Sequence, residues 1–346
     1  MESTTNLSSN LTLKVLQTLR NRLIAIAKEA GTIILSANPT PLTTSSKKNS
    51  PSPHHPSSPC TKTPLTHKTH LLFTAADIVT QTDKAVESLI RTNLASHYPS
   101  FAFIGEETYH PGQTITNEPT FIVDPIDGTS NFVHGFPDVA VSIALVVNKV
   151  PTVGVVYNPF RDELWSAIKD HGAYHTTQAR SNNINTTTTN NDISSFENTK
   201  QLSPKSPLLG LSPACIAIEF GSDRQGPNFA LNLQVFTTLL RTASDGGRFV
   251  NSLRCSGSAA IAICRVAAGQ QDAFWECGSW AWDVAAAWCV LVEAGGVMVD
   301  GHPGGWNPPV DNRRYLAVRP ATAGQREFVE EFWDVIGDDR STYGPP

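Results

Sequence analysis

Hydrophobic positions recur with helical spacing near the start of the chain, over residues 13–36. The apolar side chains fall three or four positions apart, which places them on one face of an α-helix. They are Leu16, Leu19, Leu23, Ile26, Ala27, Ala30 and Ile34. The pattern stops at residues 37–70, where proline, serine and threonine replace the apolar positions. A segment of this composition cannot bury enough apolar surface to fold, so we expect a disordered insertion there.

Short apolar runs follow, and several of them end in acidic residues. Residues 77–83 predict an extended segment that leads into a helix, whose apolar stripe includes Val86 and Ile90. The runs at 101–107 and 121–127 predict two strands, each ending in carboxylates. Further strands are expected at 139–148, 152–159 and 163–168. This part of the chain is therefore expected to be rich in sheet.

Strand and helix patterns alternate in the second half of the chain, which favours a layered α/β arrangement. We expect strands at 214–220, 272–276, 296–300 and 314–318, and helices at 226–241, 257–268, 283–294 and 323–335. A low-complexity segment at 176–207 precedes them. We therefore expect a sheet-rich N-terminal subdomain over 1–175 and a C-terminal α/β subdomain over 208–346.

Composition narrows the class of protein. The chain has 346 residues, 40% of them hydrophobic, and a net charge of −5, which argues against a nucleic-acid binder with a basic face. No apolar run approaches the roughly 18–20 residues of a membrane span, and the first residues lack the features of a signal peptide. The six cysteines show no paired spacing. We expect a cytoplasmic protein with reduced cysteines.

The acidic residues that follow apolar runs form the strongest chemical signal. Asp83, the pair Glu106 and Glu107, and the pair Asp124 and Asp127 each follow such a run, and Asp283 stands at the start of an apolar helix. Each acid taken alone is more simply explained as a helix cap or a solvated turn residue. Because strand ends and helix starts meet at one edge of a sheet, the whole set predicts a common site.

Clustered carboxylates need cations to offset their repulsion. Oxygen ligands without cysteine or histidine at ligand spacing favour Mg²⁺ over Zn²⁺. The sequence DGTSN after Ile126 offers backbone amides at an expected helix start, which suit the oxygens of a phosphate. Carboxylates, cations and phosphate together predict metal-assisted phosphoryl transfer to water.

Four motifs carry a family resemblance. The stretch DPIDGTSNFVHGFP at 124–137 resembles the first signature of the inositol monophosphatase family, and WDVAAAWCVLVEAGG at 282–296 resembles the second. The upstream motifs DIVTQTD and FIGEE occur in the family's order. The resemblance implies an α+β fold, a layered αβαβα sandwich like that of fructose bisphosphatases. It also implies Mg²⁺ dependence, inhibition by Li⁺ and a homodimer.

The resemblance assigns roles to the acidic residues. Glu106, Asp124 and the carbonyl of Ile126 would bind a first Mg²⁺, and Asp124, Asp127 and Asp283 a second. Glu106 would also help to hold a third, weaker ion. Thr129 and Asp83 would orient and deprotonate the attacking water, supported by Glu106. Glu107 and Asp77 would support the ligands from behind.

The same resemblance predicts a substrate side. The amides of Gly128 and Thr129 would hold the phosphate, while Glu276, Ser258 and Ala259 would contact the alcohol. Trp280 lies outside the second signature. Two interpretations of Trp280 stay open: its side chain narrows the pocket for the alcohol, or it packs between the two subdomains.

The substrate is predicted as an inositol monophosphate. Sugar phosphates and nucleotide bisphosphates stay open as alternatives, and the family also has members in fungal quinate-utilisation clusters. A non-catalytic regulatory protein on the same fold is a further alternative. The complete set of expected ligands speaks against it.

Overall fold

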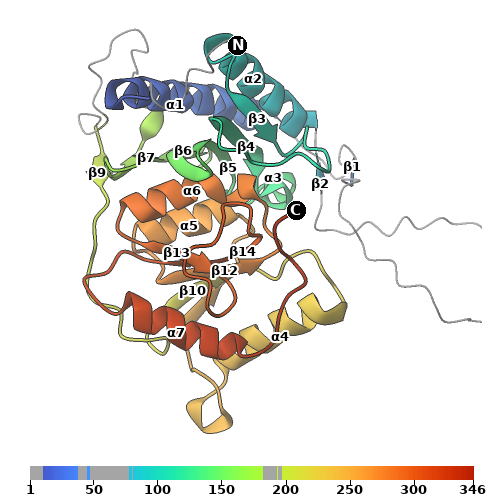
Figure 1. Ribbon diagram of the computed structural model, residues 1–346, viewed down its shortest axis with the longest axis vertical. Coiled ribbons are helices and arrows are strands. Elements are labelled where there is room, and N and C mark those ends of the chain that lie inside the picture. Colours follow the sequence, from blue (N-terminus) through green and yellow to red (C-terminus); the bar gives the residue numbers. More distant parts are fainter. Residues whose placement is uncertain (1–10, 38–44, 47–77, 80, 182–192, 194–196) are drawn as a thin grey trace, which may run out of the picture.

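The computed structural model describes residues 11–37, 45–46, 78–79, 81–181, 193 and 197–346 (Figure 1). The expected disordered insertion at 37–70 therefore lies almost entirely outside the described residues, and so does Asp77. A two-residue strand β1 (Ser45–Ser46) pairs antiparallel with β2 (Ile78–Val79). Among the described residues, no helix combines the length and the apolar character that crossing a membrane requires.

A seven-stranded sheet forms the first half, in the order β3-β4-β5-β6-β7-β8-β9. Only β3 and β4 run parallel; the other neighbouring pairs are antiparallel. The strands are β3 (Ala102–Gly105), β4 (Thr120–Asp127), β5 (Ala140–Val147), β6 (Val150–Asn158), β7 (Glu163–Ile168), β8 (Ala173–Thr177) and β9 (Thr199–Gln201). All residues of β4 and β5 are buried, because both faces of the sheet are covered by helices.

Helices α1 (Leu13–Ser36) and α2 (Gln81–His97) cover one face of this sheet (Figure 1). The apolar stripe expected over 13–36 is buried against β5, β6 and β7, and the helix has the expected bounds. Val86, Ile90 and Leu94 bury the equivalent face of α2. The helical periodicity in the sequence thus correctly identified the faces that form the core.

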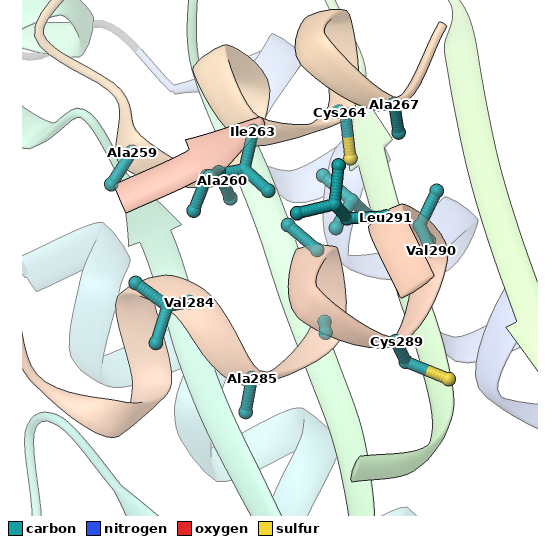
Figure 2. Close-up of a cluster of buried hydrophobic side chains, with 14 of the residues drawn as sticks. Ala259, Ala260, Ile263, Cys264, Ala267, Val284, Ala285, Cys289, Val290 and Leu291 are labelled. Carbon is teal, nitrogen blue, oxygen red and sulfur yellow. The ribbon is translucent and has the colours of Figure 1, made fainter. Parts of the chain in front are cut away.

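Two helices, α5 (Ala259–Ala267) and α6 (Ala281–Glu293), cover the other face and form the central layer. Figure 2 shows side chains of the buried cluster on these helices, which combines small residues such as Ala260, Ala267 and Ala285 with larger ones such as Ile263 and Leu291. Helix α6 approaches β6 so closely that a Cβ at Gly154 would overlap the carbonyl oxygen of Ala286. The small residues therefore allow helices and sheet to pack without a gap.

A five-stranded sheet lies beyond the central helices, in the order β11-β10-β12-β14-β13. Its strands are β10 (Cys215–Ile218), β11 (Ser252–Arg254), β12 (Ala273–Cys277), β13 (Val297–Asp300) and β14 (Arg314–Val318). Helices α4 (Gly226–Leu240) and α7 (Gln325–Ile336) form the outermost layer. The five layers confirm the expected αβαβα sandwich.

The shortest elements differ from the expectations. Strand β8 crosses the expected boundary between residues 175 and 176, and β9 pairs with it from within the segment taken as a low-complexity separator. These strands, like β11, contain few alternating apolar residues, because they lie at or near the sheet edges. The described residues also include α3 (Thr129–His134) and 3₁₀ turns at Ala179–Ser181 and Ala243–Asp245.

Candidate metal and phosphate site

The end of β4 carries two acids on an irregular strand. In a regular strand, Asp124 and Asp127 would point to opposite faces, because they are three residues apart. The pairing with β5 shifts between these positions: Asp124 lies opposite Ser142, and Asp127 lies opposite Ala140. One extra residue on β4 changes the alternation. The bulge thus removes the alternation that would otherwise place the two side chains on opposite faces.

Three carboxylates from separate elements meet at this point. Glu106 follows β3, Asp124 lies on β4, and Asp283 lies in the first turn of α6. One ligand oxygen from each lies within 4.8 Å of the other two. Because carboxylates at this spacing repel one another, the arrangement fits an oxygen-preferring cation such as Mg²⁺.

Asp127 is held by the start of α5. Its Oδ2 accepts hydrogen bonds from the Ser258 hydroxyl at 2.5 Å and from the Ala260 amide at 2.9 Å. Burial and the charge of Glu106 raise the pKa of Asp127 to about 7, and the bonds from Ser258 and Ala260 oppose this shift. A nearby cation would favour the ionised form instead.

Thr129 links the strand end to α2. Its hydroxyl donates to the carboxylate of Asp83 at 3.2 Å and lies 3.1 Å from the carbonyl oxygen of Ile126. Asp83 is fully buried in the first turn of α2. The Ile126 amide donates to Asp124 at 2.9 Å. Four of the expected site residues therefore lie along one path of hydrogen-bonding distances, in which the single Thr129 hydrogen can bond to Asp83 or to Ile126.

The turn between β4 and α3 depends on Gly128. Its φ is +90°, and a Cβ there would lie 2.8 Å from the carbonyl oxygen of Asp138 and 3.1 Å from that of Gly257. Glycine is the residue that adopts this conformation without strain. The close approach brings the β4–α3 turn against the loop that precedes α5.

Glu107 lies behind the site. Its amide donates to Glu87 of α2 at 2.7 Å, and burial raises the pKa of Glu87. The backbone that carries Glu106 is therefore tied to α2. This contact is consistent with a supporting position for Glu107, while the role expected for it stays a prediction.

The expected substrate-side residues lie on the second half of the molecule. Glu276 is the second-last residue of β12 and is half-buried, and burial together with the charge of Glu219 raises its pKa. Ser258 is 1% exposed, and its hydroxyl also accepts a hydrogen bond from the Ile261 amide at the start of α5. In the structure Ser258 therefore positions Asp127 and caps α5, so its expected contact with the alcohol stays a prediction, as does that of Ala259.

Sequence reasoning missed the side chains that join the two halves. Asn131 donates to the carbonyl oxygens of Asp138 and Ser256 at 2.8 and 2.7 Å. The carboxylate of Asp138 forms ion pairs with Arg265 of α5 and with Arg161. Asn131 lies within the first signature and Asp138 directly follows it. Their position within the signature, or directly after it, was the signal that could have indicated them.

Glu219 was not among the expected site residues, yet it orders the loop before α5. Its Oε1 accepts from the amides of Ser256 and Gly257 at 2.7 and 2.9 Å. The same loop contacts Gly128 and Asn131. Glu219 therefore fixes the second half of the molecule against the β4–α3 turn.

Comparison with known proteins shows which family the sequence matches. The model of the inositol monophosphatase family matches residues 15–336. A curated relative, inositol monophosphatase 2 of Saccharomyces cerevisiae, is 46% identical over 270 residues, covering 76% of this chain and 84% of that protein. Protein qutG of Emericella nidulans is 36% identical over 279 residues, covering 74% and 78%.

Solved structures agree with the fold. The suppressor protein suhB from Bartonella henselae has a TM-score of 0.66 at 25% identity, with 93% of this chain and 99% of that chain covered. The inositol monophosphatase from Anabaena has a TM-score of 0.63 at 24% identity, with 93% and 94% covered.

Proposed function

Because the chain belongs to the inositol monophosphatase family and is a phosphatase, we propose that it hydrolyses inositol monophosphate to inositol and phosphate with Mg²⁺ as cofactor. The observation that carries the proposal is the meeting of Glu106, Asp124 and Asp283 within 4.8 Å of one another. The sequence distances between them are long, so only the fold creates this cluster.

The proposed ligands are those that the family resemblance assigns. Glu106, Asp124 and the Ile126 carbonyl would hold one Mg²⁺, and Asp124, Asp127 and Asp283 a second, with Glu106 also sharing a third. When bound, these ions supply Lewis-acid activation of water and charge neutralisation on the phosphate. Li⁺ inhibition follows if Li⁺ competes for one of these positions.

Thr129 and Asp83 would handle the proton of the attacking water. A hydroxyl has one hydrogen, so Thr129 can donate to Asp83 or to Ile126 at any moment. A ligand role for the Ile126 carbonyl would leave Asp83 as the acceptor. Thr129 could then accept the water proton as its own proton passes to Asp83. The water oxygen would then bond to phosphorus as the ester P–O bond breaks, the leaving alkoxide would take a proton from solvent water, and Asp83 would return its proton to solvent.

The backbone amides of Gly128 and Thr129 are proposed to orient the phosphate. The left-handed turn at Gly128 supports this, because the absence of a Cβ leaves the backbone open to close approach. Glu276 would accept hydrogen bonds from the hydroxyl groups of the alcohol, with Ser258 and Ala259 beside it. Glu107 and Asp77 would support the ligands.

Phosphate release from a panel of esters tests the proposal. We would compare inositol monophosphates, sugar phosphates and adenosine bisphosphate, each with Mg²⁺, with EDTA and with added Li⁺. Release that requires Mg²⁺, falls with Li⁺ and is fastest with inositol monophosphates is the expected result. Faster release from another ester would keep the mechanism and reject the substrate. Equal release in EDTA would reject the Mg²⁺ site.

We also propose a homodimer in the cytoplasm, as the family resemblance implies. Light scattering on the purified full chain would measure the mass directly. A monomer across the micromolar range would contradict this part of the proposal without affecting the chemistry.

A further inference from the structure

The chain after α7 does not end near that helix. Figure 1 shows residues 337–346 running back from α7 toward the start of α6. The amide of Ser341 donates to His302 Nε2 at 3.1 Å. Thr342 and Asn228 exchange two hydrogen bonds, at 2.7 Å and 2.9 Å. These contacts fix the segment on the second half of the molecule.

Tyr343 lies near the end of this segment. Its hydroxyl donates to Asp223 at 2.8 Å, and its carbonyl oxygen accepts from Arg314 at 2.7 Å. The ring lies against Gly278, where an added Cβ would be 3.2 Å from it. Gly278 stands between β12, which carries Glu276, and the start of α6. Tyr343 therefore contacts the connection that leads into the helix of Asp283.

Arg313 joins Tyr343 to Trp280. Its guanidinium carbon lies 5.0 Å from the centre of the Tyr343 ring and 3.7 Å from that of Trp280. One guanidinium nitrogen donates to the Gly278 carbonyl at 2.8 Å. Within the described part of the chain, Arg313 forms no ion pair with a carboxylate. The two rings and one carbonyl are thus its principal partners.

Trp280 connects this stack to the candidate metal site. Its amide donates to Asp283 Oδ2 at 2.6 Å, directly before α6 begins. Its indole stacks on Trp282 with ring centres 5.0 Å apart, and the Tyr109 ring packs against both indoles. A shift of the Trp280 backbone would therefore move a donor that orients the carboxylate of Asp283.

We propose that Tyr343 and Arg313 are positioning residues for Asp283, acting through Trp280, so that the segment after α7 sets the affinity for Mg²⁺. This inference rests on the proposed role of Asp283 as a ligand. It differs from plain packing between layers, because packing alone predicts lost stability and leaves the cation affinity unchanged.

Variants of the full chain separate these interpretations. Tyr343→Ala removes the ring, whereas Tyr343→Phe keeps the ring and removes only the bond to Asp223. Arg313→Lys keeps the charge but loses the planar stack. Arg340→Ala is the matched control, because Arg340 is exposed and its hydrogen bonds go to the nearby carbonyls of Gly337 and Asp339.

Two measurements are needed, and the first requires no metal. Hydrogen exchange of the amides at 280–283 in metal-free protein should become about tenfold faster in Tyr343→Ala and Arg313→Lys, and remain unchanged in Arg340→Ala. Calorimetric titration with Mg²⁺ should then show affinity weakened about tenfold in the same two variants. Tyr343→Phe should stay within about twofold of the parent in both measurements, because it keeps the ring.

The outcomes distinguish the two proposals. Unchanged exchange at 280–283, or faster exchange with unchanged Mg²⁺ affinity, would overturn the positioning role and leave the proposed function intact. A parent protein that binds no Mg²⁺ would overturn the proposed function and this role for Asp283 together. Weaker Mg²⁺ binding in Tyr343→Ala and Arg313→Lys, but not in Tyr343→Phe or Arg340→Ala, supports the inference.

Discussion

The β4–α3 turn and the start of α6 supply acids to one site but hold them differently. At the turn, a bulge, a left-handed glycine and the Ile126 amide act within residues 124–129, and Asp127 is also held by the start of α5. At α6, the Trp280 amide donates to Asp283, and Arg313 from a distant segment lies against the Trp280 ring. Local geometry can be recognised as a motif, whereas the second arrangement depends on the whole fold.

The largest effect should come from the turn itself. Asp124→Asn should lower kcat/KM by on the order of 10³-fold or more, since one carboxylate serves both proposed ions. Without Mg²⁺ its melting temperature should equal or exceed that of the parent, because a repulsive charge is removed. Steady-state kinetics and thermal unfolding measure both quantities. The exposed Asp170→Asn serves as the control, and retained activity in Asp124→Asn would reject the metal site.

A substitution at Gly128 tests whether backbone geometry holds the first region. Gly128→Ala should destabilise the fold by more than the about 1–2 kcal/mol expected for a left-handed alanine, since its Cβ would approach the Asp138 carbonyl. Activity should fall up to about 10²-fold through misplacement of Asp127 and Thr129. Denaturant unfolding and kinetics measure these effects.

Gly135→Ala is the matched comparison. Gly135 has a φ of +69° but an added Cβ would meet nothing within 4 Å. It should show the conformational cost alone, with activity close to that of the parent. Equal behaviour of the two variants would mean that the close approach at Gly128 does not matter.

The sequence predicted long elements and the meeting of the acids better than it predicted local irregularities of the backbone. Long periodic elements were predicted closely: α1 has the expected bounds, and α6 begins two residues before its expected start. Glu106, Asp124 and Asp283 were expected to meet, and their ligand atoms do so, although cation binding itself stays a prediction. The bulge in β4 was not foreseen, because hydrophobic alternation carries no information about register shifts.

Contacts between distant side chains could not be derived from pattern. Arg313 lies in a polar stretch and Tyr343 lies beyond the last apolar helix, so neither shows periodicity or a motif. The strands β8 and β9 were missed for a related reason. Their side chains are partly exposed and polar, and only pairing with neighbours makes them strands.

A smaller effect should appear in the pH dependence of stability, through Asp127 at the β4–α3 turn. In metal-free protein, burial raises the pKa of Asp127 to about 7, from an ordinary value of 3.8. The folded state therefore binds more protons than the unfolded chain between about pH 4 and pH 7, and its free energy of unfolding should fall as pH rises through that window.

Mg²⁺ should reverse this loss, because it competes with the proton on Asp127. The rise in melting temperature on adding Mg²⁺ should be larger at pH 8 than at pH 5.5. Thermal unfolding across this range, with and without Mg²⁺, measures the difference. Asp127→Asn should flatten the metal-free profile, and a profile that kept its slope in this variant would assign the titration to another group.

The smallest effect is expected where β5 meets α6. The buried hydroxyl of Ser142 donates to the Trp282 carbonyl at 3.1 Å. Ser142→Ala should cost about 1 kcal/mol of unfolding free energy, as for a typical hydrogen bond, and change kcat/KM less than about threefold. Chemical denaturation provides the measurement. A large loss of activity would show that this single bond, rather than the ring stack, positions the start of α6.

Because the acids of the site come from both halves of the chain, they are synthesised at different times. A ribosome releases Asp83, Glu106, Asp124 and Asp127 with the first sheet, long before α6 delivers Asp283. Since segments nearer the N-terminus begin to fold during synthesis, the partial cluster exists for a period without its last acid. A nascent chain at that stage holds an incomplete set of the proposed ligands. If Asp283 has the proposed role, the cation site is complete only after the second half has emerged and docked.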